Sequence, residues 1–205
     1  MKKLIVVGSG GHGKVVAEAA YASEKYESVL FLDSHYPQCK DEKVIGHSDS
    51  FVEHISDNVE FIVAIGDSSV RYYLSNQICL HGGVLAVVIH PDAVLSNRVN
   101  LGLGTFIGAL AVVNSGSRIG MSCIINTCAL VEHDCNIGDG VHISPKAALA
   151  GHVIVGDKTW IGIGATIIDK IVIGESVIVG AGAVVINNIK DGKTVVGIPA
   201  KETAK

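Results

Sequence analysis

The C-terminal half of the chain carries an aliphatic residue at every sixth position, with no break in phase from residue 89 to residue 185. The seventeen positions are Ile89, Leu95, Leu101, Ile107, Val113, Ile119, Ile125, Val131, Ile137, Ile143, Leu149, Val155, Ile161, Ile167, Ile173, Val179 and Val185. The fourth residue after each is usually small or β-branched. A repeat with a short fixed period is typical of a solenoid, in which each unit contacts only its neighbours.

A unit of six residues can form one short strand and one turn, but it cannot bury its own apolar side chain. Three units close a triangular coil of 18 residues, and seventeen units make about five and two-thirds coils with a continuous aliphatic column inside. The residue after the column position is glycine in eight units, where we expect turns that need permissive backbone angles. The eight are Gly102, Gly108, Gly120, Gly138, Gly156, Gly162, Gly174 and Gly180. Such a solenoid could also be a scaffold only, or a carbonic-anhydrase-like enzyme.

Composition excludes several classes of protein. The chain is 48% apolar but only 5% aromatic and contains 24 glycines, which favours many short strands over a helical bundle. A net charge of −4 without a basic stripe argues against nucleic acid as a partner. No apolar run is long enough for a membrane span, and the run at 4–7 is too short for a signal peptide. Five cysteines without a CxxC pair favour a reduced, cytoplasmic protein over a disulfide framework or zinc knuckle.

Residues 1–88 follow a different pattern, in which short apolar runs alternate with amphipathic stretches. We expect strands at 3–8, 29–33, 60–66 and 84–88, and helices at 14–23 and 69–80. Such alternation predicts a small parallel sheet covered by helices. The sequence therefore predicts two domains, an α/β half-Rossmann-like domain at 1–88 and a β-solenoid with a C-terminal tail at 89–205.

The first expected strand is followed by a glycine-rich turn. Gly8, Ser9, Gly10, Gly11, His12 and Gly13 match the pattern G-x-G-x-x-G, and Asp33 lies 20 residues after the last glycine. The glycines allow a tight turn and a close approach of phosphate to the N-terminus of a helix. The pattern is typical of NAD sites, but four strands are half of a dinucleotide fold, so a mononucleotide or nucleotide sugar fits better. A glycine turn without a ligand is the alternative.

Six stretches, spread over both halves, resemble one family. They are VVGSGGHGKV (6–15), FLD (31–33), AIGD (64–67), IINTCALVEHDCNIGD (124–139), VHISPKAALAGHVIVG (141–156) and VGIPAK (196–201). The solenoid resembles the hexapeptide-repeat acyltransferases. The whole chain resembles the nucleotide-sugar acetyltransferases of the sialic acid O-acetyltransferase (NeuD/PglD-like) type, above all members that acetylate UDP-4-amino-4,6-dideoxy sugars in bacillosamine and related pathways. The resemblance implies a left-handed parallel β-helix, acetyl-CoA as co-substrate, and a homotrimer. Nothing in the sequence calls for a metal.

The same resemblance makes His133 the catalytic base, which assists attack of the sugar amine on acetyl-CoA. Asp134 stands where relatives often carry Glu, and would orient His133 or increase its basicity. The shorter side chain leaves Glu132 as an alternative partner. Gly151 lies 18 residues after His133 and should stack one coil above it, where its backbone N–H could meet the thioester carbonyl.

His142 follows His133 by nine residues, half a coil, so the two should point to different sides of the prism. They could cooperate only across a subunit interface, which motivates a trimer with shared sites. By resemblance His142 contacts acetyl-CoA, and Asn126 contacts the sugar substrate. The alternatives are a structural interface histidine and a turn asparagine.

The last coils and the tail carry the remaining candidates. Gly162 and Gly180 would let the pantetheine arm of coenzyme A lie along the helix surface, and by resemblance Lys201 approaches the coenzyme A phosphates. A solvated tail charge is the alternative for Lys201. Trp160 is expected at a turn, against adenine or a neighbouring subunit. His152 should stack above Asp134 and has no assigned role.

Taken together, we expect an acetyl-CoA-dependent N-acetyltransferase acting on the 4-amino group of a nucleotide-linked 4-amino-4,6-dideoxy sugar, with UDP as the preferred nucleotide. Residues 8–13, Asp33 and Gly66 would hold the nucleotide, and His133 would drive direct transfer. The alternatives are O-acetylation of sialic acid or another sugar hydroxyl, N-acetylation of a GDP- or dTDP-linked amino sugar, and a nucleotide-sugar-binding scaffold without activity.

Overall fold

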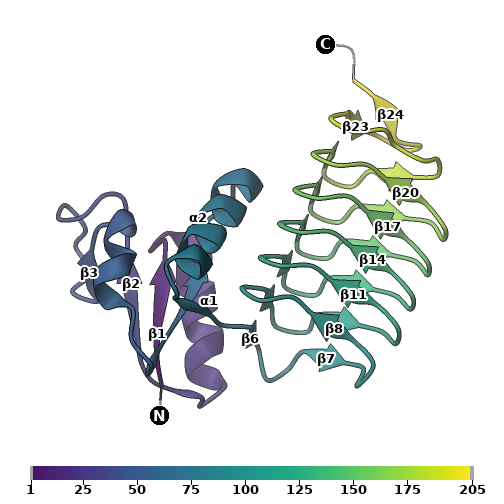
Figure 1. The fold of residues 1–205 in the computed structure, drawn as a ribbon. Helices are drawn as coiled ribbons and strands as arrows, with labels where there is room; N and C mark the ends of the chain where they lie inside the picture. The colour runs from purple at the N-terminus through teal and green to yellow at the C-terminus, as the bar shows by residue number, and fades with distance from the viewer. Residues whose placement is uncertain (1, 204–205) are drawn as a thin grey trace.

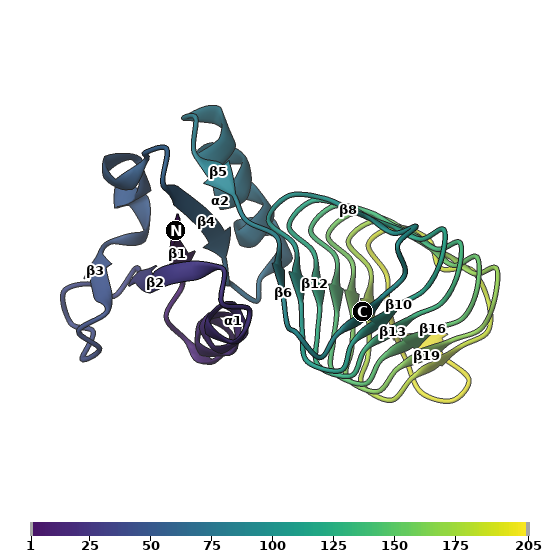
Figure 2. The same ribbon diagram turned by 90° about the horizontal axis from the view of Figure 1, so that it is seen from below.

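A computed structural model describes residues 2–203 and divides them into an α/β domain and a β-helix that lie side by side (Figure 1). Seen from below, the β-helix is a stack of triangular coils, with strand β6 at the edge nearest the α/β domain (Figure 2). Among residues 2–203, no helix is both long and apolar enough to cross a membrane.

The N-terminal sheet is parallel, with strand order β3-β2-β1-β4-β5. Leu4 and Val6 of β1 face helix α1, whereas Ile5 and Val7 face Ile78 of helix α2, because successive side chains of a strand point to opposite faces. The elements in chain order are β1 (Lys2–Val7), α1 (Gly11–Ala22), β2 (Tyr26–Leu32), β3 (Val44–Gly46), the 3-10 helix η1 (Ser48–His54), β4 (Val59–Val63), α2 (Ser68–Leu80) and β5 (Val84–Leu85).

Several details of this domain differ from the sequence prediction, including the bounds of β2 and β4. The sheet has five strands instead of four, because the three-residue strand β3 is too short to leave an alternating pattern. The expected strand at 84–88 ends at Leu85, and Val88 belongs to the first strand of the β-helix. Helix α1 begins at Gly11 instead of residue 14, so the second half of the glycine turn is already helical.

The β-helix contains one two-residue strand for each six-residue unit, and these strands line three faces. Face 1 consists of β6 (Val88–Ile89), β9 (Phe106–Ile107), β12 (Ile124–Ile125), β15 (His142–Ile143), β18 (Trp160–Ile161), β21 (Ile178–Val179), β23 (Thr194–Val196) and the antiparallel β24 (Lys201–Glu202). Face 2 consists of β7 (Val94–Leu95), β10 (Val112–Val113), β13 (Leu130–Val131), β16 (Ala148–Leu149), β19 (Thr166–Ile167) and β22 (Val184–Val185). Face 3 consists of β8 (Asn100–Leu101), β11 (Arg118–Ile119), β14 (Asn136–Ile137), β17 (Ile154–Val155) and β20 (Val172–Ile173).

In each strand from β6 to β22, the second residue points into the prism and belongs to the aliphatic column that the six-residue period predicts. From Ile107 to Val185 every column residue is buried, whereas Ile89, Leu95 and Leu101 are only partly buried at the open first coil. Small residues such as Ala111 fill the corners beside the column. The expected left-handed parallel β-helix is thereby confirmed.

The reason expected for the glycines after the column positions was wrong. None of the eight has a positive φ; the left-handed position lies two residues later, at residues such as Asp134 and His152. The glycines are needed for contact between coils instead. A Cβ on Gly162 would lie 2.6 Å from the carbonyl oxygen of Val179, and one on Gly180 would lie 2.7 Å from a methyl carbon of Val196.

The two domains are joined by a buried arginine of helix α2. Arg71 is 1% exposed and donates hydrogen bonds to backbone carbonyl oxygens on both sides of the junction. Its Nε reaches Ser122 at 2.8 Å and Nη2 reaches Gly140 at 2.6 Å in the β-helix, while Nη1 reaches Ile65 at 2.8 Å and Gly66 at 3.0 Å. Burial lowers the pKa of Arg71 to about 10, so it stays charged.

We expect Arg71→Met to lower the free energy of unfolding by about 3 kcal/mol, because carbonyl groups on both sides of the junction lose a buried donor. Urea unfolding would measure the change. The matched control is Arg98→Met, at an exposed position, which should change stability by less than about 0.5 kcal/mol. Equal stability of the two variants would contradict this role for Arg71.

Candidate active site

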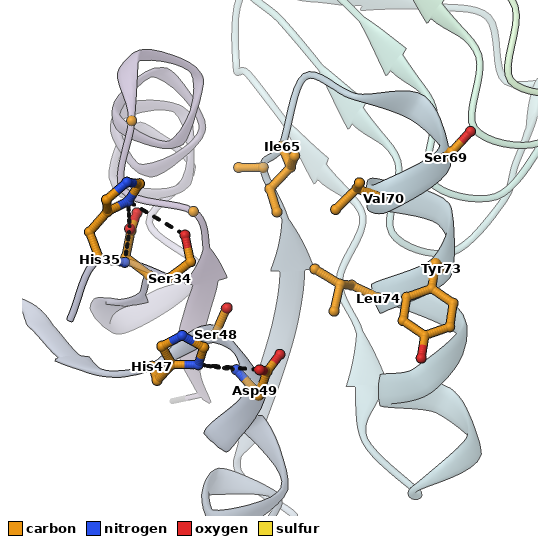
Figure 3. A pocket seen from close by; sticks show the side chains of 14 residues that line it. Ser34, His35, His47, Ser48, Asp49, Ile65, Ser69, Val70, Tyr73 and Leu74 are labelled. Carbon is orange, nitrogen blue, oxygen red and sulfur yellow. Dashed lines mark hydrogen bonds and ion pairs between the residues drawn. The ribbon is translucent and has the colours of Figure 1, made fainter.

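A cavity of about 800 Å³ opens at the carboxyl ends of β1, β2 and β4, where the strand order of the sheet reverses. Ligands of open parallel sheets bind at this place. Figure 3 shows Ser34 and His35 on one side of the cavity and Val70 and Leu74 of α2 on the other. Its lining residues are Gly8, Gly10, Asp33, Ser34, His35, His47, Ser48, Asp49, Ala64, Ile65, Ser69, Val70, Tyr73 and Leu74.

Asp33 lies at this cavity, but its carboxylate is fully engaged within the protein. Oδ2 accepts hydrogen bonds from the backbone N–H and the hydroxyl of Ser9, both at 2.7 Å. Oδ1 accepts from the backbone N–H of His35 at 2.9 Å and lies 3.0 Å from the ring nitrogen Nδ1 of His35. Burial raises the pKa of Asp33, but the hydrogen bonds outweigh it and hold the pKa well below the ordinary value. Asp33 therefore fixes the glycine turn.

The glycine turn runs directly into helix α1. Gly8 has φ +107°, and a Cβ on Gly13 would collide with the Gly8 carbonyl oxygen, whereas Cβ atoms on Gly10 and Gly11 would meet nothing within 4 Å. Gly10 is the N-cap and offers no side-chain cap, so the first backbone N–H groups of α1 remain available to an anion. His12 lies in this first turn, with its ring edge-on to Phe106 of the β-helix at 5.3 Å.

Two further cavities continue from the first along face 1. The second, of about 540 Å³, lies between Gly66, Ser68 and Ser69 at the start of α2 and His142 of the β-helix. Ser69 also lines the first cavity. The third, of about 360 Å³, shares His142, Trp160 and Ile178 with the second and includes Gly162 and Gly180. Shared residues thus link the three cavities from the sheet of the α/β domain to the upper coils.

His142 is held in one orientation where the second and third cavities meet. Its ring stacks on Trp160 with centroids 6.2 Å apart and an interplanar angle of 9°, and its Nε2 lies 3.1 Å from Asn126 Nδ2. Asn126 Oδ1 accepts from the backbone N–H of Thr127 at 2.8 Å, which leaves Nδ2 as the donor to Nε2. The proton of neutral His142 is therefore on Nδ1, as a free donor. Asn126, expected to contact the sugar, orients this histidine.

His133 and Asp134 form a pair on the turn between faces 2 and 3. His133 Nδ1 lies 2.9 Å from Asp134 Oδ2, so Nδ1–H donates to the carboxylate and Nε2 keeps its lone pair for a substrate proton. Glu132 accepts instead from the backbone N–H of His133, at 3.3 Å. Gly151 lies over the ring as the 18-residue step predicts, and a Cβ there would sit 2.7 Å from Nε2.

The structure does not bring all the predicted site residues together in one chain. His133, Asp134 and Gly151 line none of the three cavities, which lie on face 1 and in the α/β domain. Lys201 is exposed on β24, at the upper end of the sheet that contains His142. The cavities of the single chain therefore contain only some of the candidate binding residues, and they do not contain the candidate base. The candidate residues that line them are Gly8, Gly10, Asp33, Gly66, His142, Gly162 and Gly180.

Sequence reasoning missed or misplaced several residues at these cavities. Trp160 lies on strand β18 instead of a turn, 47% exposed, and its Nε1 donates to Ser144 at 2.8 Å. The 18-residue step from His142 to Trp160 could have predicted their stacking. Lys158 lines the second cavity and was not identified. Arg71 left no signal in the sequence, because an arginine in a helix is usually exposed.

The fold defines the class first: the protein is a β-helix of six-residue repeats with an α/β domain before it. The PglD N-terminal domain matches residues 3–78. That match covers less than half of the chain, but the similarity over the whole chain to the acetyltransferase domain of PglB and to PerB shows that it belongs to the PglD-like family.

Several solved structures are similar to this chain over its whole length. The acetyltransferase domain of PglB from Neisseria gonorrhoeae FA1090 is 40% identical with a TM-score of 0.95, covering 99% of this chain and 100% of that one. PerB from Caulobacter crescentus, solved with CoA and GDP-perosamine, is 36% identical with a TM-score of 0.93, covering 100% and 98%. UDP-N-acetylbacillosamine N-acetyltransferase of Bacillus subtilis (strain 168) is 39% identical over 113 residues, 53% of this chain. That match spans about half of the relative's own length, 52%.

We expect the two buried histidines to make stability depend on pH. The ordinary pKa of histidine is 6.5. Burial is the main cause that lowers the pKa of His12 to about 4 and the pKa of His142 to about 3, and the charge of Arg71 is the second cause. Below pH 6.5 the unfolded chain binds protons that the folded chain does not, so stability falls as pH falls. The loss between pH 7 and pH 5 should be about 2 kcal/mol for each histidine.

Urea unfolding at pH 7 and pH 5 would measure this loss. His142→Gln should remove about half of the histidine contribution, whereas the control His81→Gln, at an exposed position, should leave the difference between the two pH values unchanged. An unchanged difference in His142→Gln would show that His142 is not kept neutral by the fold.

Proposed function

We propose that this chain is an acetyl-CoA-dependent N-acetyltransferase that acts on the 4-amino group of a UDP-linked 4-amino-4,6-dideoxy sugar. The observation that carries the proposal is the linked series of three cavities. The first has the glycine turn and sheet edge that suit a nucleotide, and the third offers small residues along face 1 for a pantetheine arm. Residues 1–88 are the nucleotide-sugar-binding domain, and residues 89–205 are the acetyltransferase domain.

The nucleotide sugar binds with its phosphates at the glycine turn, where Gly8 to Gly13 present helix N–H groups. Gly66 and the start of α2 then face the sugar in the second cavity. Acetyl-CoA binds along face 1 beside Gly162 and Gly180, and Lys201 meets its phosphates. Both substrates are metabolites of the cytoplasm, where we place the protein.

The transfer step needs a base, a carbonyl donor and a leaving thiol. The nitrogen of the sugar 4-amino group attacks the thioester carbon, and His133 Nε2 takes a proton from that nitrogen. Asp134 orients the imidazole and stabilises the positive charge that develops on it. His142 Nδ1–H and the Gly151 backbone N–H donate to the carbonyl oxygen as it gains negative charge. The carbon–sulfur bond then breaks, and coenzyme A leaves as a thiolate that takes up a proton.

Because the base lies off face 1, we propose a homotrimer in which His133 of one subunit completes the cavities of its neighbour. The outward residues of face 2, beside the His133 turn, support this arrangement, because most of them are apolar. Val94 is 61% exposed, and Val112, Leu130 and Val184 are partly exposed in the single chain. An apolar row of this kind suits a subunit interface.

The proteins that are similar to this chain differ in the nucleotide of the sugar named with them. The Bacillus subtilis relative is named for a UDP sugar, and PerB was solved with GDP-perosamine. A GDP-linked amino sugar is therefore the second candidate.

We expect rapid release of coenzyme A thiol from acetyl-CoA with UDP-4-amino-4,6-dideoxy-N-acetylglucosamine, and much slower release with the GDP and dTDP counterparts or with sialic acid. A thiol-release assay run with the four acceptors side by side would test this. Faster release with the GDP sugar would move the proposal to the second candidate, and release with sialic acid alone would indicate O-acetylation. No release with any acceptor, while acetyl-CoA binds, would contradict the proposed acceptor class.

We expect His133→Ala to lose at least about 100-fold in kcat, the usual contribution of a general base. Coenzyme A binding, followed by the fluorescence of Trp160, should persist, and the control His81→Ala should keep full activity. If sites are shared, co-expressed His133→Ala and His142→Ala subunits should recover roughly a quarter of the active sites, although each variant alone is inactive. No recovery in mixed oligomers would place both histidines of each site on one chain.

A further inference from the structure

His152 lies beside the proposed catalytic pair, and the proposed acetyl transfer does not use it. Its Nε2 is 3.9 Å from Asp134 Oδ2, the same oxygen that lies 2.9 Å from His133 Nδ1. One ligand atom from each of the three residues lies within 4.8 Å of the others. The three side chains are 53%, 52% and 53% exposed, in the order His133, Asp134 and His152.

The coil geometry produces this cluster. Asp134 and His152 occupy the same position in successive coils and share the left-handed conformation, each with φ +58°. The backbone N–H of His152 donates to the carbonyl oxygen of His133 at 3.0 Å, which fixes one turn above the other. The rings of His133 and His152 lie 5.2 Å apart at 89°.

The separation between His152 and Asp134 suits an ion better than a direct contact. At 3.9 Å the two atoms are too far apart for a hydrogen bond. Ligand atoms that share a zinc ion at bond lengths of about 2 Å lie about 3–4 Å apart. The three ligand atoms lie within 4.8 Å of one another, and the half-exposed side chains can rotate to bring them closer together.

We propose that His133, Asp134 and His152 form a binding site for Zn²⁺ that inhibits the enzyme. Two imidazole nitrogens and one carboxylate are a ligand set of zinc and its transition-metal neighbours, whereas Mg²⁺ and Ca²⁺ prefer oxygen ligands. Three protein ligands leave a fourth position for water. The site needs no cysteine.

The inhibition follows from the tautomer of His133, and this part rests on the proposed function. Zinc takes the lone pair of Nδ1, so the proton that Nδ1 carries moves to Nε2, with no net change in protonation. Nε2–H has no lone pair to accept the proton of the sugar amine. Zinc also takes Asp134 away from His133, so both parts of the base are lost together.

Equilibrium dialysis of the untagged protein against Zn²⁺, without substrates, tests the site. We expect one zinc per chain and at least a tenfold weaker affinity in His152→Ala and in the milder His152→Asn. The control His81→Ala should bind as the wild type does, and Mg²⁺ should not compete. Cobalt in place of zinc should give visible bands of nitrogen and oxygen ligation, without thiolate charge-transfer bands.

Activity provides the second readout. Zinc should inhibit thiol release by the wild type, and inhibition of His152→Ala should need at least tenfold more zinc. Zinc affinity that is unchanged in both His152 variants would overturn the proposal. Zinc affinity that is lost in Cys79→Ser would also overturn it, because the exposed thiol of Cys79 would then be a ligand. Dialysis needs no turnover, so the two proposals can fail separately. A protein that binds zinc at His152 but has no activity contradicts only the proposed function. A protein that is active but binds no zinc contradicts only this site.

Discussion

Backbone hydrogen bonds between successive coils set an 18-residue step, and the contacts of the candidate base with the next coil depend on it. The step places His152 beside Asp134 and stacks Trp160 on His142. The glycines after the column positions let the coils approach this closely, because a Cβ would collide with the next coil. A change in coil spacing would therefore disturb the core and the site together.

Arg71 has a comparable role between the domains. It ties the loop after β4, including Gly66, to the β-helix carbonyls of Ser122 and Gly140, so the first and second cavities keep a fixed relation. The same charge acts with burial to keep His142 neutral. One buried cation thus holds the geometry between the nucleotide end and the acetyl end, and favours the protonation state that the proposed transfer needs.

The sequence predicted those features of the fold and of the candidate site that repeat with a fixed period. The column from Ile107 to Val185, the position of Gly151 over His133 and the closeness of His152 to Asp134 all follow from counting residues. Strand β3 was missed because three residues carry no period. The glycines after the column positions were expected for their backbone conformation, whereas contact with the next coil requires them. The period locates these residues, but it does not say whether the conformation or a neighbouring residue requires glycine.

The sequence by itself determined the β-helix, its 18-residue coil and the glycine turn after β1, because each is a local pattern repeated or bounded by glycines. Only the tertiary structure decided that Asn126 orients His142, that Asp33 holds the glycine turn, and that Arg71 joins the domains. These contacts depend on which side chains meet at a junction, and Arg71 reaches partners 51 and 69 residues away. Contacts over such separations leave no pattern in a single sequence, because nothing local requires them.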